Sequence, residues 1–177
     1  FLTMAQASLA LYPALADELR ALTKVDVDLR REGLLQVALD DEDVETLHAT
    51  SLQQEQAGVP VQLLSADEAR ALEPVLSVEA RGGLCFVNGW QVDNRLLNWA
   101  LLTAATDAGV KVHRGRKVAR IVCENHRASG VEVNSETHHA RWVVIAAGAW
   151  SGTIDGASLP VRPAKGHALM LDASDIP

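Results

Sequence analysis

The opening of the chain carries apolar side chains at alternating steps of three and four residues. This spacing places them along one stripe of an α-helix. The positions that follow it are Leu2, Ala5, Leu9, Tyr12, Ala16 and Leu19. Pro13 lies within the stretch and is expected to kink the helix, because proline lacks a backbone donor and its ring crowds the preceding turn.

Residues 33–39, with the sequence GLLQVAL, predict a largely buried strand. The acidic cluster at residues 40–43 favours a helix that opens near Val44, since carboxylates stabilise the positive end of the helix dipole. Gly58 marks the expected C-terminal stop of that helix.

Short strand and turn signals alternate in the next stretch. Residues 59–64 predict a strand, and residues 65–68 have the Ser-x-x-Glu pattern of a capping box, which starts a short helix that Pro74 ends. Residues 84–92 predict a β-hairpin or two strand segments, because Asn88-Gly89 in their middle is a tight-turn dipeptide.

The clearest helix follows Asp93, a good N-cap, and ends at Gly109, which suits a left-handed C-terminal cap. Its apolar positions are Leu96, Leu97, Ala100, Leu101, Ala104 and Ala108. Residues 110–113 then predict a strand. Helix, glycine and strand in this order form a unit that parallel α/β sheets use repeatedly.

The pattern changes after this unit. Residues 117–123, 130–134 and 138–140 predict a small antiparallel meander, because apolar and polar positions alternate in them. Residues 142–146 are continuously apolar and largely β-branched, which is typical of a strand covered on both faces. Residues 167–171 are a further candidate strand.

Composition and charge narrow the classes of partner. The net charge of −7 and the pI near 5.3 argue against nucleic acid and anionic membranes, both of which attract clustered Lys and Arg. The longest apolar stretches fall short of the roughly 18 to 20 residues that span a bilayer.

Cys85 and Cys123 form no Cys-x-x-Cys pair, so a reducing cytoplasm is the simplest expectation. Because the chain opens directly on a helix pattern at Phe1, we expect it to be cut from something longer.

Small residues follow the apolar run at residues 142–146. Residues 146–149 read Ala-Ala-Gly-Ala, which lets backbone approach a phosphate or an isoalloxazine ring closely. The alternative is a plain tight turn packed under a helix. The meander, the apolar run and this turn in that order resemble the FAD-binding domain of two-domain flavoproteins, and this resemblance favours the cofactor alternative.

The order of these elements, together with short motifs along nearly the whole chain, resembles the D-amino-acid oxidase superfamily, and within it the glycine oxidase type of thiamine biosynthesis. The motifs that carry the resemblance are residues 11–13 (LYP), 31–35 (REGLL), 72–74 (LEP), 89–93 (GWQVD), 145–151 (IAAGAWS) and 160–167 (PVRPAKGH).

The resemblance implies residues for binding FAD. It places Val118 where the family uses backbone groups to hold the adenine end, and Ala147, Gly148 and Trp150 beside the cofactor. A core role for Val118 and for Trp150 stays open. Lys165 is implied to lie near the mouth of the active site, with a solvated turn lysine as the alternative.

Several family features have no counterpart in the sequence. No Gly-x-Gly-x-x-Gly phosphate loop is present, and the family's substrate-carboxylate arginine belongs to a later region. Catalytic residues are therefore unknown. His138 and His139 are neighbours on a predicted strand, so they point to opposite faces, and no metal site is expected.

The predicted fold class is α/β with an α+β substrate part. It combines a Rossmann-like FAD-binding portion with a mixed or antiparallel substrate domain, both incomplete. Residues 1–93 and 157–177 are expected in the substrate domain, and residues 94–156 in the FAD-binding domain.

The resemblance implies an intact enzyme that uses FAD to oxidise glycine or another small amine or amino acid to the imine, with peroxide as the second product. The present chain alone is expected to be inactive, and a homo-oligomer stays open. The alternatives are a quinone-linked D-amino-acid dehydrogenase of the same superfamily, and a scaffold fragment without cofactor.

Overall fold

The computed structural model describes residues 2–157 and 159–166. The chain divides into two compact units, Phe1–Val110 and Lys111–Pro177. The division into a substrate domain and an FAD-binding domain, with borders at 93/94 and 156/157, remains a prediction.

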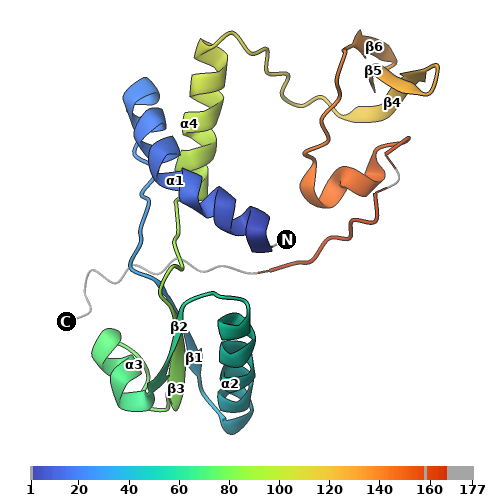
Figure 1. The fold of residues 1–177 in the computed structure, drawn as a ribbon. Helices are drawn as coiled ribbons and strands as arrows, with labels where there is room; N and C mark the ends of the chain where they lie inside the picture. Colours follow the sequence, from blue (N-terminus) through green and yellow to red (C-terminus); the bar gives the residue numbers. More distant parts are fainter. Residues whose placement is uncertain (1, 158, 167–177) are drawn as a thin grey trace. The chain divides into compact units, whose positions relative to one another are not determined.

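Two helices of the first unit pack against each other, α1 (Leu2–Thr23) and α4 (Asn94–Asp107) (Figure 1). Their shared core is centred on Leu19, Val27 and Ala100, all nearly inaccessible to solvent. Leu19 comes from the predicted apolar stripe of the first helix, and Pro13 lies inside that helix as expected. Burial of these stripes is the main stabilisation of the helix pair.

The start and end of α4 are fixed by the residues that the sequence indicates. The Asp93 carboxylate accepts hydrogen bonds from the backbone N–H groups of Arg95 and Leu96, at 2.8 and 3.1 Å. Gly109, just past the end, has a φ of +86°, a conformation that favours glycine.

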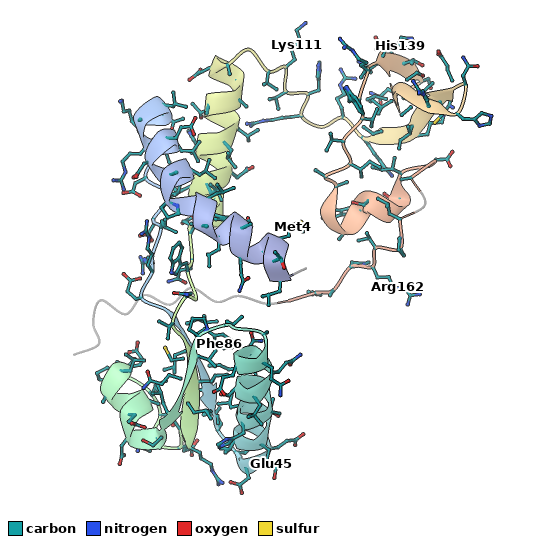
Figure 2. The ribbon with its side chains drawn as sticks, in the orientation of Figure 1. Met4, Glu45, Phe86, Lys111, His139 and Arg162 are labelled. Carbon is teal, nitrogen blue, oxygen red and sulfur yellow. The ribbon has the colours of Figure 1, made fainter. Side chains whose placement is uncertain are left out.

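The remainder of the first unit is a three-stranded sheet. Its strands are β1 (Leu34–Ala38), β2 (Val61–Ser65) and β3 (Gly82–Phe86), in the order β1-β3-β2. The central β3 runs antiparallel to both neighbours. Figure 2 labels Phe86 at the end of this central strand.

One helix covers each face of this sheet. The helix α2 (Asp41–Gln56) buries Leu47 against Ala38 and Leu84 on one face. The short α3 (Ala66–Leu72) brings Ala69 close to Gly83 on the other face. Asp40 caps the first of these helices, and Ser65 with Glu68 forms the predicted capping box of the second. The helix positions predicted between residues 40 and 74 are thus confirmed.

The hairpin alternative at residues 84–92 and the strand predicted at residues 110–113 are not formed. The segment at residues 90–92 does not form a hairpin with β3, because after the Asn88-Gly89 turn Gln91 bridges to Arg30 instead. Residues 110–113 form no strand, and Val110 and Val112 are 53% and 42% exposed. No described residue pairs with this second segment, and a strand needs a paired neighbour to be stable.

The second unit is built on the predicted meander of β4 (Val118–Glu124), β5 (Arg127–Val133) and β6 (Glu136–His139). They pair antiparallel in the order β4-β5-β6. Each hairpin turns through two residues with positive φ, Asn125-His126 and Asn134-Ser135. Such two-residue turns match the twist of the strands and fix their register.

The buried strand predicted at residues 142–146 is not formed. Trp142 is 83% exposed and Val144 is 87% exposed, and no strand is assigned there. Among the described residues, no strand pairs with this apolar run, so the burial on both faces that the sequence pattern requires is not reached. The chain continues into a 3₁₀ helix, η1 (Gly148–Thr153).

After that 3₁₀ helix, Asp155 lies parallel beside β4 and exchanges backbone hydrogen bonds with Ala119 and Ile121. The strand predicted at residues 167–171 lies outside the described residues. Among the helices that the structure describes, none is both long and apolar enough to cross a membrane. Cys85 and Cys123 are free thiols.

Candidate cofactor site

An open hollow of about 480 Å³ lies over one face of the meander. The strand register explains its floor, because Val118 stands opposite Val133, and Val131 stands opposite His138. The residues that line the hollow are His113, Arg116, Val118, Val131, Val133, Glu136 and His138.

The hollow combines an apolar floor with a polar rim. The three valines can receive the face of a flat ring, while the rim offers the guanidinium of Arg116 and two imidazoles as donors. The rings of His113 and His138 lie with their centroids 6.1 Å apart and tilted by 50°. Glu136 adds one negative charge. The set therefore suits a ligand with a flat apolar part and polar substituents.

Val118 starts β4 and is half-buried. The pairing of β4 with β5 shifts register between Val118 and Arg120, as in a β-bulge. On the edge of β4 that faces away from β5, the carbonyl of Ala119 accepts a hydrogen bond from the Asp155 backbone N–H. Bonds on both edges hold this strand start in place.

An ion pair fixes the same strand to its neighbour. The guanidinium of Arg120 donates to the Glu132 carboxylate from Nη2 at 2.8 Å and from Nε at 3.1 Å. The hydrogen bond to Glu132 and its negative charge raise the pKa of Arg120. This pair ties β4 to β5 across the meander.

Gly148 adopts a left-handed backbone conformation, which favours glycine. Its φ is +53°, and no neighbouring atom lies within 4 Å of the point where a Cβ would stand. Ala147, directly before it, accepts a hydrogen bond from the Trp150 backbone N–H at 3.0 Å. The Trp150 side chain is 72% exposed. The turn is therefore accessible, and a ligand can approach its backbone.

The predicted site residues occupy two places in the second unit. Val118 lines the hollow, whereas Ala147, Gly148 and Trp150 are not part of its lining. Lys165 is exposed. A joint contact of the four predicted residues with FAD thus stays a prediction.

The rim of the hollow, formed by His113, Arg116, Glu136 and His138, was not predicted from the sequence. The signal that could have found part of it is the two-residue Asn134-Ser135 turn, because it sets Glu136 opposite Val133 and so places alternate residues of β6 on the valine face. Figure 2 labels the adjacent His139, which follows His138 on the same strand.

The donors fit one portion of FAD. A valine floor with cationic and imidazole donors suits an adenosine with its charged substituent, and the open backbone at Gly148 suits close approach of a flat or anionic group. The sequence holds no Gly-x-Gly-x-x-Gly loop for the pyrophosphate. In the described part of the chain, no group of three or more His, Cys, Asp or Glu residues could hold a metal ion.

Relatives of known name match nearly the whole chain. It is 36% identical to the glycine oxidase of Geobacillus kaustophilus over 176 residues, which is 96% of this chain and 46% of that protein. It is 34% identical to the hydrogen cyanide synthase subunit HcnC of Pseudomonas aeruginosa over 177 residues, 97% of this chain and 42% of the relative. The chain thus spans less than half the length of these relatives.

The fold is also similar to a solved structure. The glycine oxidase of Bacillus cereus superposes with a TM-score of 0.76 at 28% identity, over 86% of this chain and 42% of that one. This likeness confirms the predicted fold class. The family described as FAD dependent oxidoreductase matches residues 1–177. The chain therefore belongs to the FAD-dependent oxidoreductase family, whose cofactor is FAD.

Proposed function

We propose that this protein is an FAD-dependent oxidase that acts on glycine or another small amine or amino acid. The observation that carries the proposal is the 36% identity to a glycine oxidase over 96% of the chain. In the proposed reaction the substrate loses a hydride and a proton to become an imine, which water hydrolyses. Bound FAD supplies the hydride acceptor, and O₂ then takes the two electrons to give H₂O₂.

The residues of this chain position the cofactor in this proposal. Backbone groups at Val118 would hold the adenine end of FAD at the hollow, whose apolar floor Val131 and Val133 complete. The open turn at Gly148 lets the cofactor approach the backbone. Ala147 would keep the approach free of bulk, and Trp150, whose side chain is exposed, would lie beside the bound cofactor.

The proposal extends to the setting of the reaction. It places the enzyme in the cytoplasm and in thiamine biosynthesis, with a small-molecule substrate. It also holds that the 177 residues alone do not turn over substrate, since they span less than half the length of the relatives.

A substrate panel tests the reaction. The natural, FAD-containing protein is expected to form peroxide from glycine and sarcosine faster than from D-alanine or D-proline, with matching loss of oxygen. A strong preference for the bulkier D-amino acids would contradict the substrate assignment. Reduction of an artificial dye without peroxide would instead indicate a dehydrogenase.

A second candidate is a hydrogen cyanide synthase subunit, favoured by the 34% identity to HcnC over 97% of this chain. The two candidates differ in a product that can be measured directly. We expect peroxide and no cyanide when the protein is given glycine. Cyanide in the same assay would favour the second candidate.

A further inference from the structure

Two histidines lie together at the rim of the hollow over the meander. The rings of His113 and His138 have their centroids 6.1 Å apart. They come from different parts of the second unit, because His113 precedes β4 whereas His138 lies on β6. The strand register places His138 opposite Val131, which belongs to the floor of the hollow. A ligand in the hollow therefore meets both imidazoles at once.

The other polar members of the rim carry opposite charges. Arg116 is a cation and Glu136 an anion at neutral pH, so their charges cancel while both imidazoles are neutral. Imidazole is the side chain whose charge ordinarily changes between pH 5 and 8. The remaining lining residues are valines, which do not titrate. Each proton that an imidazole takes up thus gives the rim one positive charge in excess.

The closeness of the two rings couples their protonation to the binding of an anion. Two imidazolium groups at this separation repel each other, and the nearby guanidinium of Arg116 adds to the repulsion. Glu136 offsets only one of these charges. A bound anion relieves the repulsion and favours the protonated rings. By linkage, protons must then strengthen the binding of the anion to the same extent.

We propose that His113 and His138 form a proton-dependent anion site, which binds the adenosine diphosphate end of FAD more tightly in mild acid than in mild base. The valine floor receives the flat ring, and the rim receives the negative charge. This inference rests on the proposed placement of the cofactor at the hollow, and not on the proposed substrate. Because the rim side chains are exposed, solvent screens their charges and the effect is modest.

Titration of FAD into the natural protein, after removal of its own FAD, tests the inference. Flavin fluorescence gives the Kd at pH 6.0 and at pH 8.0, and the diphosphate of FAD has the same charge at both. We expect binding about fivefold tighter at pH 6.0. Calorimetry in two buffers of different ionisation enthalpy should show protons taken up on binding. Equal affinity at the two pH values, or no proton uptake, overturns the proposal.

Neighbouring histidines supply the matched control. The double variant His113→Gln/His138→Gln should reduce the ratio of the two Kd values to less than twofold. His139→Gln should keep the full ratio, because His139 follows on the same strand but does not line the hollow. Arg116→Gln should weaken binding at both pH values and keep the pH dependence, since guanidinium stays charged throughout. A full ratio in the double variant, or a lost one in His139→Gln, overturns the proposal.

A single variant guards against misfolding of the double one. His113→Gln changes no strand residue and should by itself lower the ratio, with the melting temperature of the protein without ligand unchanged. An unchanged ratio in this variant overturns the proposal.

Two further probes separate the anion from the ring. ADP-ribose carries the diphosphate and should show the pH dependence of FAD, whereas uncharged adenosine should bind equally at both pH values. The same pH dependence for adenosine overturns the proposal, as does a protein that binds neither FAD nor ADP-ribose. None of these readouts uses turnover. Bound FAD that glycine leaves oxidised would therefore contradict the proposed reaction alone, and FAD binding that is independent of pH would contradict this inference alone.

Discussion

Asp93 shows how one side chain sets the start of a helix. Its carboxylate accepts from two backbone N–H groups at the N-terminus of α4 and from the Arg95 guanidinium. The hydrogen bond from the Arg95 side chain, followed by that from the Leu96 backbone, lowers the pKa of Asp93. Ser65 and Asp40 act similarly at the other helices. Such signals are local, and for this reason the sequence predicts them well.

The lowered pKa of Asp93 predicts a pH dependence of stability. Because the folded pKa lies below the unfolded one, ionised Asp93 stabilises the fold at neutral pH, and this contribution is lost as pH falls from about 4 through the lowered value. Asp93→Asn keeps a capping oxygen without the charge. In urea unfolding, the variant should be less stable at pH 7 and equal to the parent in strong acid.

Asp17→Asn is the control for that measurement, because Asp17 is exposed and has no side-chain hydrogen bond with a described residue. It should leave the pH profile unchanged. A constant difference between Asp93→Asn and the parent at all pH values would contradict the charge-based explanation.

Gly148 allows a residue-scale test of the cofactor site. Asparagine tolerates positive φ, so Gly148→Asn keeps the backbone but adds bulk at the open side. If FAD approaches this backbone, the variant should bind FAD at least tenfold more weakly, measured by flavin fluorescence in the FAD-binding protein. Gly109→Asn, at a φ of +86° with equally open surroundings, should bind like the parent. Equal affinity in all three proteins would remove Gly148 from the site.

At the scale of elements, the meander depends on close approach of two strands. Gly130 on β5 faces the backbone of β6, where a Cβ would stand 2.2 Å from the His138 carbonyl oxygen. A backbone atom cannot move aside as a flexible side chain would. Glycine at this position is therefore needed for the pairing that carries His138 to the hollow.

Gly130→Ala should separate β6 from β5. We expect a loss of about 1–3 kcal/mol in the free energy of unfolding of this unit, the usual cost of overpacking. Amide exchange of residues 136–139 should become rapid. Gly166→Ala, where a Cβ meets nothing within 4 Å, is the control. Unchanged protection in the Gly130 variant would contradict the register.

The sheet of the first unit makes an equivalent prediction. Leu84, on the central strand β3, is fully buried against Leu47 of α2. Leu84→Ala should lower the free energy of unfolding by about 2–5 kcal/mol in denaturant titration. Leu39→Ala, at a position that is 56% exposed, should have little effect. Similar losses in the two variants would contradict the described core.

The accuracy of the sequence predictions follows from how local each signal is. Capping residues located α2, α3 and α4, apolar spacing located α1, and the alternation of apolar and polar residues located the meander, and all of these signals act within a few residues. The strands expected at residues 110–113 and 142–146 depend on neighbours far away in sequence, and no described residue pairs with either run. The polar rim of the hollow was missed because it depends on strand register and not on a motif. Val118 was predicted only through the family resemblance, and Gly148 through the small residues around it together with that resemblance, and the contact of both with FAD stays a prediction.

At the scale of the whole molecule, the family assignment and the site geometry address different questions. The match over residues 1–177 establishes the FAD-dependent family. The hollow and the open turn at Gly148 are the places where we propose that this chain contacts the cofactor. The proposed substrate is inferred from the relatives, and the chain covers less than half of the length of each.

Anaerobic titration of the natural, FAD-containing protein with glycine tests the central claim most directly. We predict that the yellow flavin absorbance bleaches on addition of glycine and returns when O₂ is admitted, with one peroxide formed for each flavin reoxidised. A protein that purifies without flavin and takes up no FAD, or a bound flavin that glycine leaves fully oxidised, would contradict the account.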